Sequence, residues 1–143
     1  MIRKTLVETH HKTEVVNVTA QVAAMVGDVT DGLAHVYIPH TTAALLINED
    51  DAGLREDLIR TAEQWLAGCR PFTHARQSNP NAEAHLLSAF GGSGLTLAIE
   101  GGRLDLGRYQ NILLLEMDGP KRREIRCQVL RAAASSSLSC SST

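Results

Sequence analysis

Three histidines of the chain, His40, His74 and His85, lie where imidazole side chains can do chemistry. His40 ends an apolar segment and precedes Thr41 and Thr42, whose hydroxyls can hydrogen-bond an imidazole or a bound anion. His74 lies in a segment without hydrophobic periodicity, and His85 follows eleven residues later, so a loop and a helix can bring them together. Three neutral imidazoles that leave a fourth position open are the ligand set of a catalytic zinc ion. No spacing such as H-x-x-x-H forces this geometry, and unrelated structural histidines are the alternative interpretation.

Acidic residues a short distance after His40 are a second kind of candidate. Asp50 or Asp51 is explained as the N-cap of a following helix, because a carboxylate there accepts hydrogen bonds from free backbone N–H groups. Glu49 is then left as a candidate general base or as a partner of a ligand histidine, with a solvated acidic turn as the alternative. We expect the remaining histidines to lie outside the site: His10, His11 and His35.

Two further segments have both a structural and a functional interpretation. The stretch 91–94 (Gly-Gly-Ser-Gly) is a helix stop or a backbone nest for phosphate, and its place after a helix favours the stop. Arg122, Arg123 and Arg126 form an exposed strand face, or they hold a phosphorylated ligand beside the histidines.

Apolar periodicity predicts the elements that carry these residues. Helices are expected over 19–27, 51–67 and 81–90, with Asn81 as the cap of the last. Strands are expected over 2–8 and 13–18, paired through a turn at 10–12, and over 33–39 and 43–48. A meander of antiparallel strands is expected over 95–99, 104–106, 109–117 and 122–129. This order indicates an α+β fold, a compact single domain in which a mostly antiparallel sheet packs with helices.

The composition limits the class of protein. The chain has 143 residues, of which 43% are hydrophobic and 3% aromatic, enough for one aliphatic core. A net charge of -2 argues against binding to nucleic acid or to an anionic membrane, since both need a concentrated basic surface. The longest apolar run, near 112–115, is far short of the ~20 residues of a membrane helix, and no signal peptide is recognisable. We expect a cytoplasmic protein.

The last residues differ in composition from the rest. We place the domain at residues 1–130 and treat 131–143 as a disordered Ala/Ser-rich tail, either natural or an extension read from an expression vector. Cys69, Cys127 and Cys140 show no paired spacing, so we expect inert thiols in a reducing compartment.

Four motifs, in order, resemble those of the YjbQ-like proteins, the uncharacterised protein family UPF0047. The first is Pro39-His40-Thr41-Thr42-Ala43-Ala44-Leu45-Leu46-Ile47-Asn48-Glu49, similar to the family's His-Thr-Ser-Ala-Ser-Leu…Asn-Glu signature. The second is the pair His74 and His85, the latter inside an Ala-His-Leu motif. The others are Gly102-Arg103-Leu104…Leu106-Gly107-x-Tyr109-Gln110-x-Ile112 and Glu116-Met117-Asp118-Gly119-Pro120-Lys121-x-Arg123. The resemblance covers residues 1–130.

This resemblance implies a homotrimer of compact α+β subunits in which the three matched histidines gather at one metal site. Zinc is the expected ion, with Mg²⁺ as the alternative beside a diphosphate substrate. The resemblance also implies a weak thiamine-phosphate synthase activity, which joins a pyrimidine diphosphate to a thiazole phosphate. The matched positions supply catalytic candidates Glu49, Arg103 and Gln110 and ligand-binding candidates Thr41, Thr42, Tyr109 and Arg123.

The chain departs from the family pattern at two places. Tyr109 replaces the usual Trp, which keeps a flat ring with a polar tip. The stretch 75–84 has lost most of the family's carboxylates, so we expect impaired activity if those acids hold Mg²⁺-diphosphate in relatives.

Three classes of function therefore remain open. The first is an enzyme, a transferase or a metal-dependent hydrolase, in which Glu49 handles a proton and Arg103 or Arg123 neutralises phosphate. The second is a non-catalytic trimer that binds a small anionic metabolite or a metal. The third is a structural histidine cluster.

Overall fold

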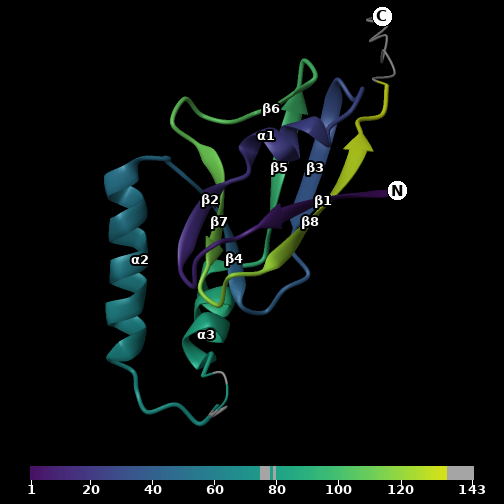
Figure 1. Ribbon diagram of the computed structural model, residues 1–143. Coiled ribbons are helices and arrows are strands. Elements are labelled where there is room, and N and C mark those ends of the chain that lie inside the picture. The colour runs from purple at the N-terminus through teal and green to yellow at the C-terminus, as the bar shows by residue number, and fades with distance from the viewer. Residues whose placement is uncertain (75–77, 79, 135–143) are drawn as a thin grey trace, which may run out of the picture.

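The computed structural model describes residues 1–74, 78 and 80–134, which form eight strands and three helices. In chain order the elements are β1 (Ile2–Glu8), β2 (Glu14–Asn17), α1 (Thr19–Ala24), β3 (Asp31–Tyr37), β4 (Ala43–Asn48), α2 (Ala52–Ala67), α3 (Ala82–Gly91), β5 (Gly94–Glu100), β6 (Arg103–Leu104), β7 (Asn111–Glu116) and β8 (Arg122–Arg131) (Figure 1). The predicted α+β class with antiparallel sheets is confirmed. No helix in the described ranges is long and apolar enough to cross a membrane.

Two antiparallel sheets are joined by a bent two-stranded ribbon, in which the segment from β1 to β2 pairs with the segment from β7 to β8. The five-stranded sheet has the order β1-β8-β3-β5-β6, and the three-stranded sheet has the order β2-β7-β4. The ribbon contributes β1 and β8 to the first sheet and β2 and β7 to the second. At its bend the corner segments 9–12 and 118–121 run side by side, where the Thr9 N–H donates to the Lys121 carbonyl at 2.8 Å and the Gly119 N–H to the Lys12 carbonyl at 3.0 Å.

The bend explains why the predicted strand pairing is wrong. β1 pairs with β8 and not with β2, and β7 and β8 lie in different sheets, so the expected meander does not form. The segments between these strands have the composition of turns, but they carry the chain from one sheet to the other. Of the consecutive strands in the predicted meander, only β5 and β6 pair with each other.

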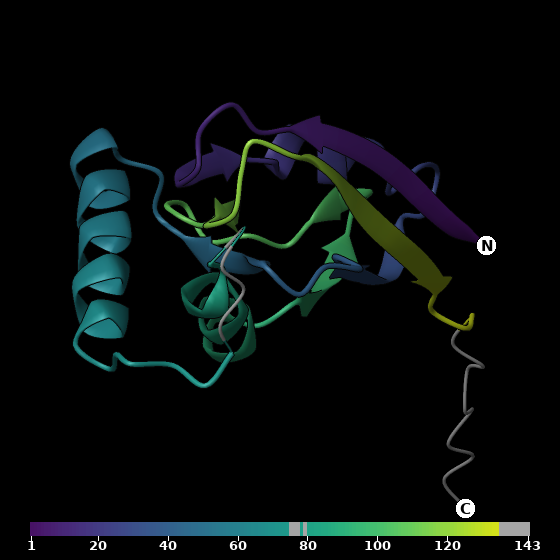
Figure 2. The same cartoon turned by 60° about the horizontal axis from the view of Figure 1, so that its bottom comes forward.

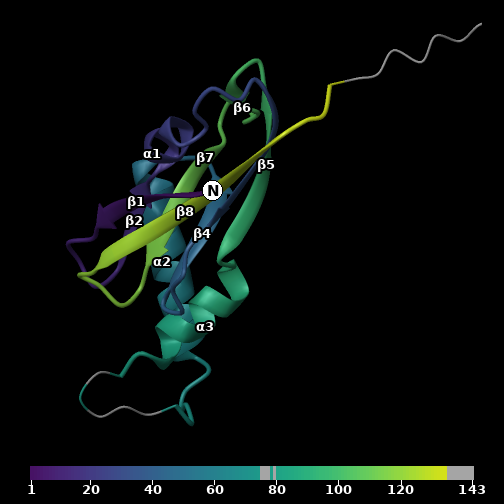
Figure 3. The ribbon, with the colours of Figure 1, turned by 90° about the vertical axis from the view of Figure 1, so that its right-hand side faces the viewer.

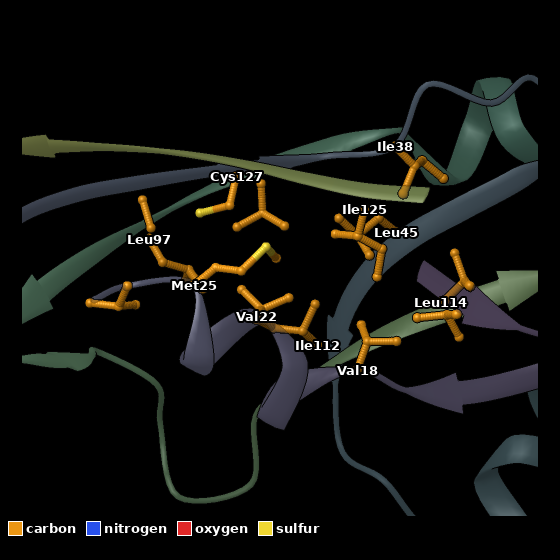
Figure 4. Close-up of a cluster of buried hydrophobic side chains, with 14 of the residues drawn as sticks. Val18, Val22, Met25, Ile38, Leu45, Leu97, Ile112, Leu114, Ile125 and Cys127 are labelled. Carbon is orange, nitrogen blue, oxygen red and sulfur yellow. The ribbon is translucent and has the colours of Figure 1, made fainter. Parts of the chain in front are cut away.

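Apolar side chains fill two layers, one on each face of the three-stranded sheet. The main core lies between the two sheets and contains Val22 of α1, Ile112 and Leu114 of β7, and Ile125 and Cys127 of β8 (Figure 4). A second cluster packs the other face of the three-stranded sheet against α2 and α3. In Figure 2 these two helices lie on the opposite side of the molecule from β1 and β8.

The sequence of β7 reflects this position between two layers. Ile112 and Leu114 point into the main core, whereas Leu113 and Leu115 belong to the cluster under the helices. A strand covered on both faces is apolar at successive positions instead of alternating. Each buried Leu contributes about 1.5–3 kcal/mol relative to an exposed one, so β7 is the apolar centre of the fold.

The long helix begins and ends where the sequence predicts. The Asp51 carboxylate accepts the Leu54 N–H at 2.9 Å as the N-cap, and the helix ends at Ala67 before Gly68. Asp50 is used differently: its carboxylate accepts from Arg55 Nε at 2.5 Å and from Asn17 Nδ2 at 2.8 Å. Asp50 thereby ties α2 to the end of β2.

α3 and β6 lie at opposite ends of the molecule (Figures 1 and 3). At the C-terminal end of the chain, β8 extends to Arg131, and the Ala132 N–H donates to the Asp31 carbonyl at 2.9 Å, slightly beyond the predicted boundary at 130. The expected tail from residue 135 onward, including Cys140, lies outside the described residues.

Candidate functional site

One face of α3 forms the wall of a cavity. His85, Ser88, Ala89 and Gly92 all line it. The first three are spaced at i, i+3 and i+4, the positions that share one side of a helix, and Gly92 directly follows the end of α3. His85 itself is half-buried, and its backbone N–H donates to the Asn81 carbonyl at 3.2 Å in the first turn.

The opposite wall is the loop between β3 and β4, which carries His40 and Thr41. Two backbone hydrogen bonds hold this loop and β4 against the residues that follow α3: Ile38 N–H to the Ser93 carbonyl and Leu45 N–H to the Gly92 carbonyl, each 2.9 Å. The cavity is open to solvent and has a volume of about 400 Å³, enough for a small metabolite. No carboxylate lines the cavity among the described residues. The lining residues are histidines, Thr, Ser and small residues, a set suited to an anion.

The hydrogen bond of His40 settles its tautomer. The backbone N–H of Glu124 donates to His40 Nε2 at 2.8 Å. A backbone amide can only donate, so Nε2 carries the ring's lone pair and the neutral ring has its proton on Nδ1. Burial lowers the pKa of His40, and the positive charge of Arg123 lowers that pKa further, so both favour the neutral ring. His40 therefore offers a ligand a donor and not a free lone pair.

His74 lies next to the cavity, on the other side of His85. The His74 and His85 rings meet edge to face with centroids 4.9 Å apart. Together with Phe72, Thr73 and Ala82 they line a small apolar hollow of about 180 Å³. His74 Nε2 is 3.2 Å from Asn81 Oδ1. The structure thus brings the three predicted histidines near one another: His85 shares one hollow with His40 and the other with His74.

Imidazole nitrogens are suitable zinc ligands, and His74 and His85 are close enough to be considered as a pair. The set of three does not fit as arranged. Within the part of the chain that the structure describes, no three His, Cys, Asp or Glu side chains are placed to hold one metal ion. His40 would have to break its bond to Glu124 to free a lone pair.

Arg123 is buried at the centre of a polar network and does not face a ligand. Its side chain is only 3% exposed, and Nε donates to Glu116 Oε1 at 2.9 Å. Nη2 donates to the other Glu116 oxygen and to both the carbonyl and the hydroxyl of Thr42, the latter two at 3.0 Å. The exposed strand face expected for the arginines of β8 is therefore wrong at Arg123, and both Arg123 and Thr42 are committed to the interior.

The remaining candidates lie away from the cavity. Arg103 on β6 is exposed, and Glu49 is exposed just after the end of β4 that is remote from His40. Tyr109 is 61% exposed under the guanidinium of Arg108, and Gln110 Oε1 accepts the Gly107 N–H at 2.8 Å to close a turn. Within the chain these side chains do not meet the histidines, because β6 and α3 are at opposite ends (Figure 3).

Sequence reasoning missed several residues of the site. Ser88 and Ser93 line the cavity, and the helical spacing of Ser88 from His85 was the signal available. Asn81 was predicted only as a helix cap. It does occupy the N-cap position, but its side chain makes no capping bond and reaches His74 and Asp118 instead.

The comparisons with known proteins agree with the four motifs. A family model described as UPF0047 protein YjbQ-like matches residues 3–132. The chain belongs to the YjbQ-like family. A UPF0047 protein of Archaeoglobus fulgidus is 39% identical over 123 residues, which are 86% of this chain and 96% of that protein. The UPF0047 protein YugU of Bacillus subtilis is 33% identical over 128 residues, 86% of this chain and 94% of that protein.

Solved structures of YjbQ-like proteins have the same fold. A hypothetical protein from Aeropyrum pernix K1 superposes with a TM-score of 0.86 at 34% identity, covering 92% of this chain and 99% of that one. A protein of unknown function from Sulfolobus solfataricus P2 gives a TM-score of 0.85 at 31% identity, covering 92% and 97%. The predicted family and fold are thereby confirmed.

Proposed function

We propose that this YjbQ-like protein binds the phosphate or diphosphate group of a small metabolite in the cavity between His40 and His85. The observation that carries the proposal is the lining of that cavity. It combines two imidazoles with the hydroxyls of Thr41, Ser88 and Ser93 and contains no carboxylate among the described residues. A lining of potential donors without a carboxylate favours anions, because each phosphate oxygen accepts several hydrogen bonds.

The reaction that we favour is group transfer with release of pyrophosphate. It corresponds to the thiamine-phosphate synthase activity that the resemblance to the YjbQ-like family implies. Departure of pyrophosphate places negative charge on the leaving oxygens, and fixed donors around them stabilise that charge. His40 supplies such a donor at Nδ1 because Glu124 occupies Nε2. His85, which lines both hollows, can hold or move a proton at the ligand.

Binding without turnover is the second candidate. The observation in its favour is that Glu49, Arg103 and Gln110, the catalytic candidates of the sequence, lie away from the cavity within one subunit. A divalent metal, zinc by ligand preference, is proposed at the pair His74 and His85, and no step of the reaction is derived through it.

The outer face of the five-stranded sheet supports self-association, for which the resemblance implies a trimer. Leu33 and Leu130 lie directly opposite each other on β3 and β8 and are 47% and 58% exposed. Leu6 on β1 is 52% exposed on the same sheet. Neighbouring exposed leucines on a sheet face are typical of a surface that packs against another subunit.

Calorimetric titration with inorganic pyrophosphate tests the proposal. We expect saturable binding by the wild type and a loss of roughly tenfold or more in affinity for His85→Ala, since one hydrogen bond to a charged group contributes about 1.5–3 kcal/mol. His35→Ala is the matched control, because His35 is exposed on β3 and absent from the cavity lining. Equal affinities for all three proteins would refute the site. Pyrophosphate release from a pyrimidine diphosphate in the presence of a thiazole phosphate then separates transfer from binding alone.

A further inference from the structure

A chain of hydrogen bonds leads from His74 into the buried interior. His74 Nε2 lies 3.2 Å from Asn81 Oδ1, and Asn81 Nδ2 donates to Asp118 Oδ2 at 3.3 Å. Asp118 is buried, and the ammonium of Lys121 is 2.5 Å from the same oxygen. An exposed loop histidine is thus connected to a buried carboxylate through one amide.

The carboxylate fixes the direction of this amide. An ionised carboxylate only accepts hydrogen bonds, and the nearby Lys121 ammonium favours the ionised form of Asp118. The NH₂ group of Asn81 must therefore face Asp118, which leaves its carbonyl oxygen facing His74. Since that oxygen also only accepts, Nε2 of His74 carries the ring proton, and its lone pair is on Nδ1.

The position of Asn81 in the fold strengthens this assignment. Asn81 is the N-cap of α3, where an asparagine side chain ordinarily bonds a backbone N–H of the first turn, yet it makes no such bond here. Its backbone carbonyl accepts the N–H of His85 at 3.2 Å. One residue therefore starts the helix that carries His85 and holds the side chain of His74 beside it.

Further hydrogen bonds continue from Asp118 into the interior. The Asp118 N–H donates to Glu116 Oε2 at 3.3 Å, and Glu116 is fully buried against Arg123. Arg123 in turn bonds Thr42, two residues after His40. The network beneath the site consequently connects the His74 side to the loop that carries His40.

We infer that Asn81 is a positioning residue for His74, with Asp118 setting the direction of the Asn81 amide. Together they hold the neutral His74 ring as the Nε2–H tautomer and present Nδ1 as the lone pair for a proton or a metal ion. A partner that fixes the tautomer of a reactive imidazole is the usual requirement for such a group. The importance of this lone pair rests on the proposed function, whereas the tautomer itself does not.

Long-range ¹H–¹⁵N correlation spectra of the ligand-free protein test the inference, recorded above the ordinary imidazole pKa. His10 and His11, exposed on the turn before β2, serve as internal references for unrestrained rings. We expect His74 to show a larger Nε2–H fraction than these references and to move to their value in Asn81→Ala. Asn48→Ala is the matched control, because Asn48 lies on β4 and, among the described residues, its side chain accepts only the N–H of its neighbour Glu49.

Two results would overturn the inference: a His74 tautomer ratio equal to that of the references in the wild type, or a ratio unchanged by Asn81→Ala. If Asn81→Ala does not fold, as judged by circular dichroism, Asp118→Asn gives the decision. An amide at 118 can donate as well as accept, so the Asn81 amide can turn over, and the Nε2–H fraction of His74 should fall. Because no ligand is present, these outcomes are independent of whether the cavity binds pyrophosphate.

Discussion

Replacing Arg123 by leucine should destabilise the fold by about 3–5 kcal/mol, the cost of leaving one member of a buried ion pair without its partner. Arg123 is 3% exposed and Glu116 is fully buried. Without the guanidinium, the Glu116 carboxylate keeps the Thr9 hydroxyl at 2.8 Å and the Asp118 N–H at 3.3 Å as its hydrogen-bond donors within the described residues. A carboxylate cannot stay ionised there without a large free-energy cost, and Thr42 also loses the donor to its carbonyl and hydroxyl.

Urea unfolding followed by circular dichroism measures this change. With a slope near 2 kcal/mol per M, a loss of about 4 kcal/mol lowers the midpoint by about 2 M. Arg126→Leu is the control, because Arg126 is 31% exposed and its pair with Glu124 is at the surface. Such a pair contributes about 0–1 kcal/mol. The double variant Arg123→Leu with Glu116→Leu should recover most of the stability, since it removes both charges.

A different result would return Arg123 to the ligand-binding role that the sequence suggests. If the free energy of unfolding of Arg123→Leu lies within about 1 kcal/mol of the wild-type value, the loss is smaller than expected for a broken buried pair. The structural assignment of Arg123 is then refuted. Weakened pyrophosphate binding with unchanged stability would point to a direct contact with phosphate.

Three further predictions concern other parts of the molecule. Hydrogen bonds from Arg55 and Asn17 lower the pKa of Asp50 to about 2, so its stabilisation is present above the ordinary carboxyl pKa and is lost as pH falls from about 4 to about 2. Asp50→Asn should therefore cost about 1–2 kcal/mol in urea unfolding at pH 7 and much less at pH 2. Leu130→Glu should convert the proposed oligomer to a monomer, which light scattering would detect as a lower molar mass. An unchanged molar mass would exclude the outer face of the five-stranded sheet as the interface. Zinc content by plasma mass spectrometry should fall in alanine variants of His74 and His85 and persist in His40→Ala; loss in His40→Ala would restore the three-histidine centre.

Local features of the chain were predictable where one segment determines them. Asp51 caps α2 because its carboxylate lies next to the free N–H of Leu54, and the apolar run of β7 follows from burial on both faces. Strand partners were not predictable in this way. β1 and β2 each look like half of a hairpin, but the corner at 9–12 sends them into different sheets, and no local pattern encodes that bend.

The same division applies to the site. The motifs identified His40, His74 and His85, which the fold brings around one helix. They misassigned Arg123, although the alternation of Arg123, Ile125 and Cys127 along β8 places all three on the buried face. The direction of hydrogen bonds could not be predicted from the sequence, because the tautomer of His40 depends on a backbone amide 84 positions away.

Residue-resolved NMR titration with inorganic pyrophosphate tests the central claim most directly. The account predicts saturable shifts of the backbone amides around His40 and Thr41 and along 85–93, with none around Arg103. The same shifts should disappear in His85→Ala. Shifts confined to the opposite end of the molecule, near Arg103 and Gln110, or no saturable shift anywhere, would contradict it.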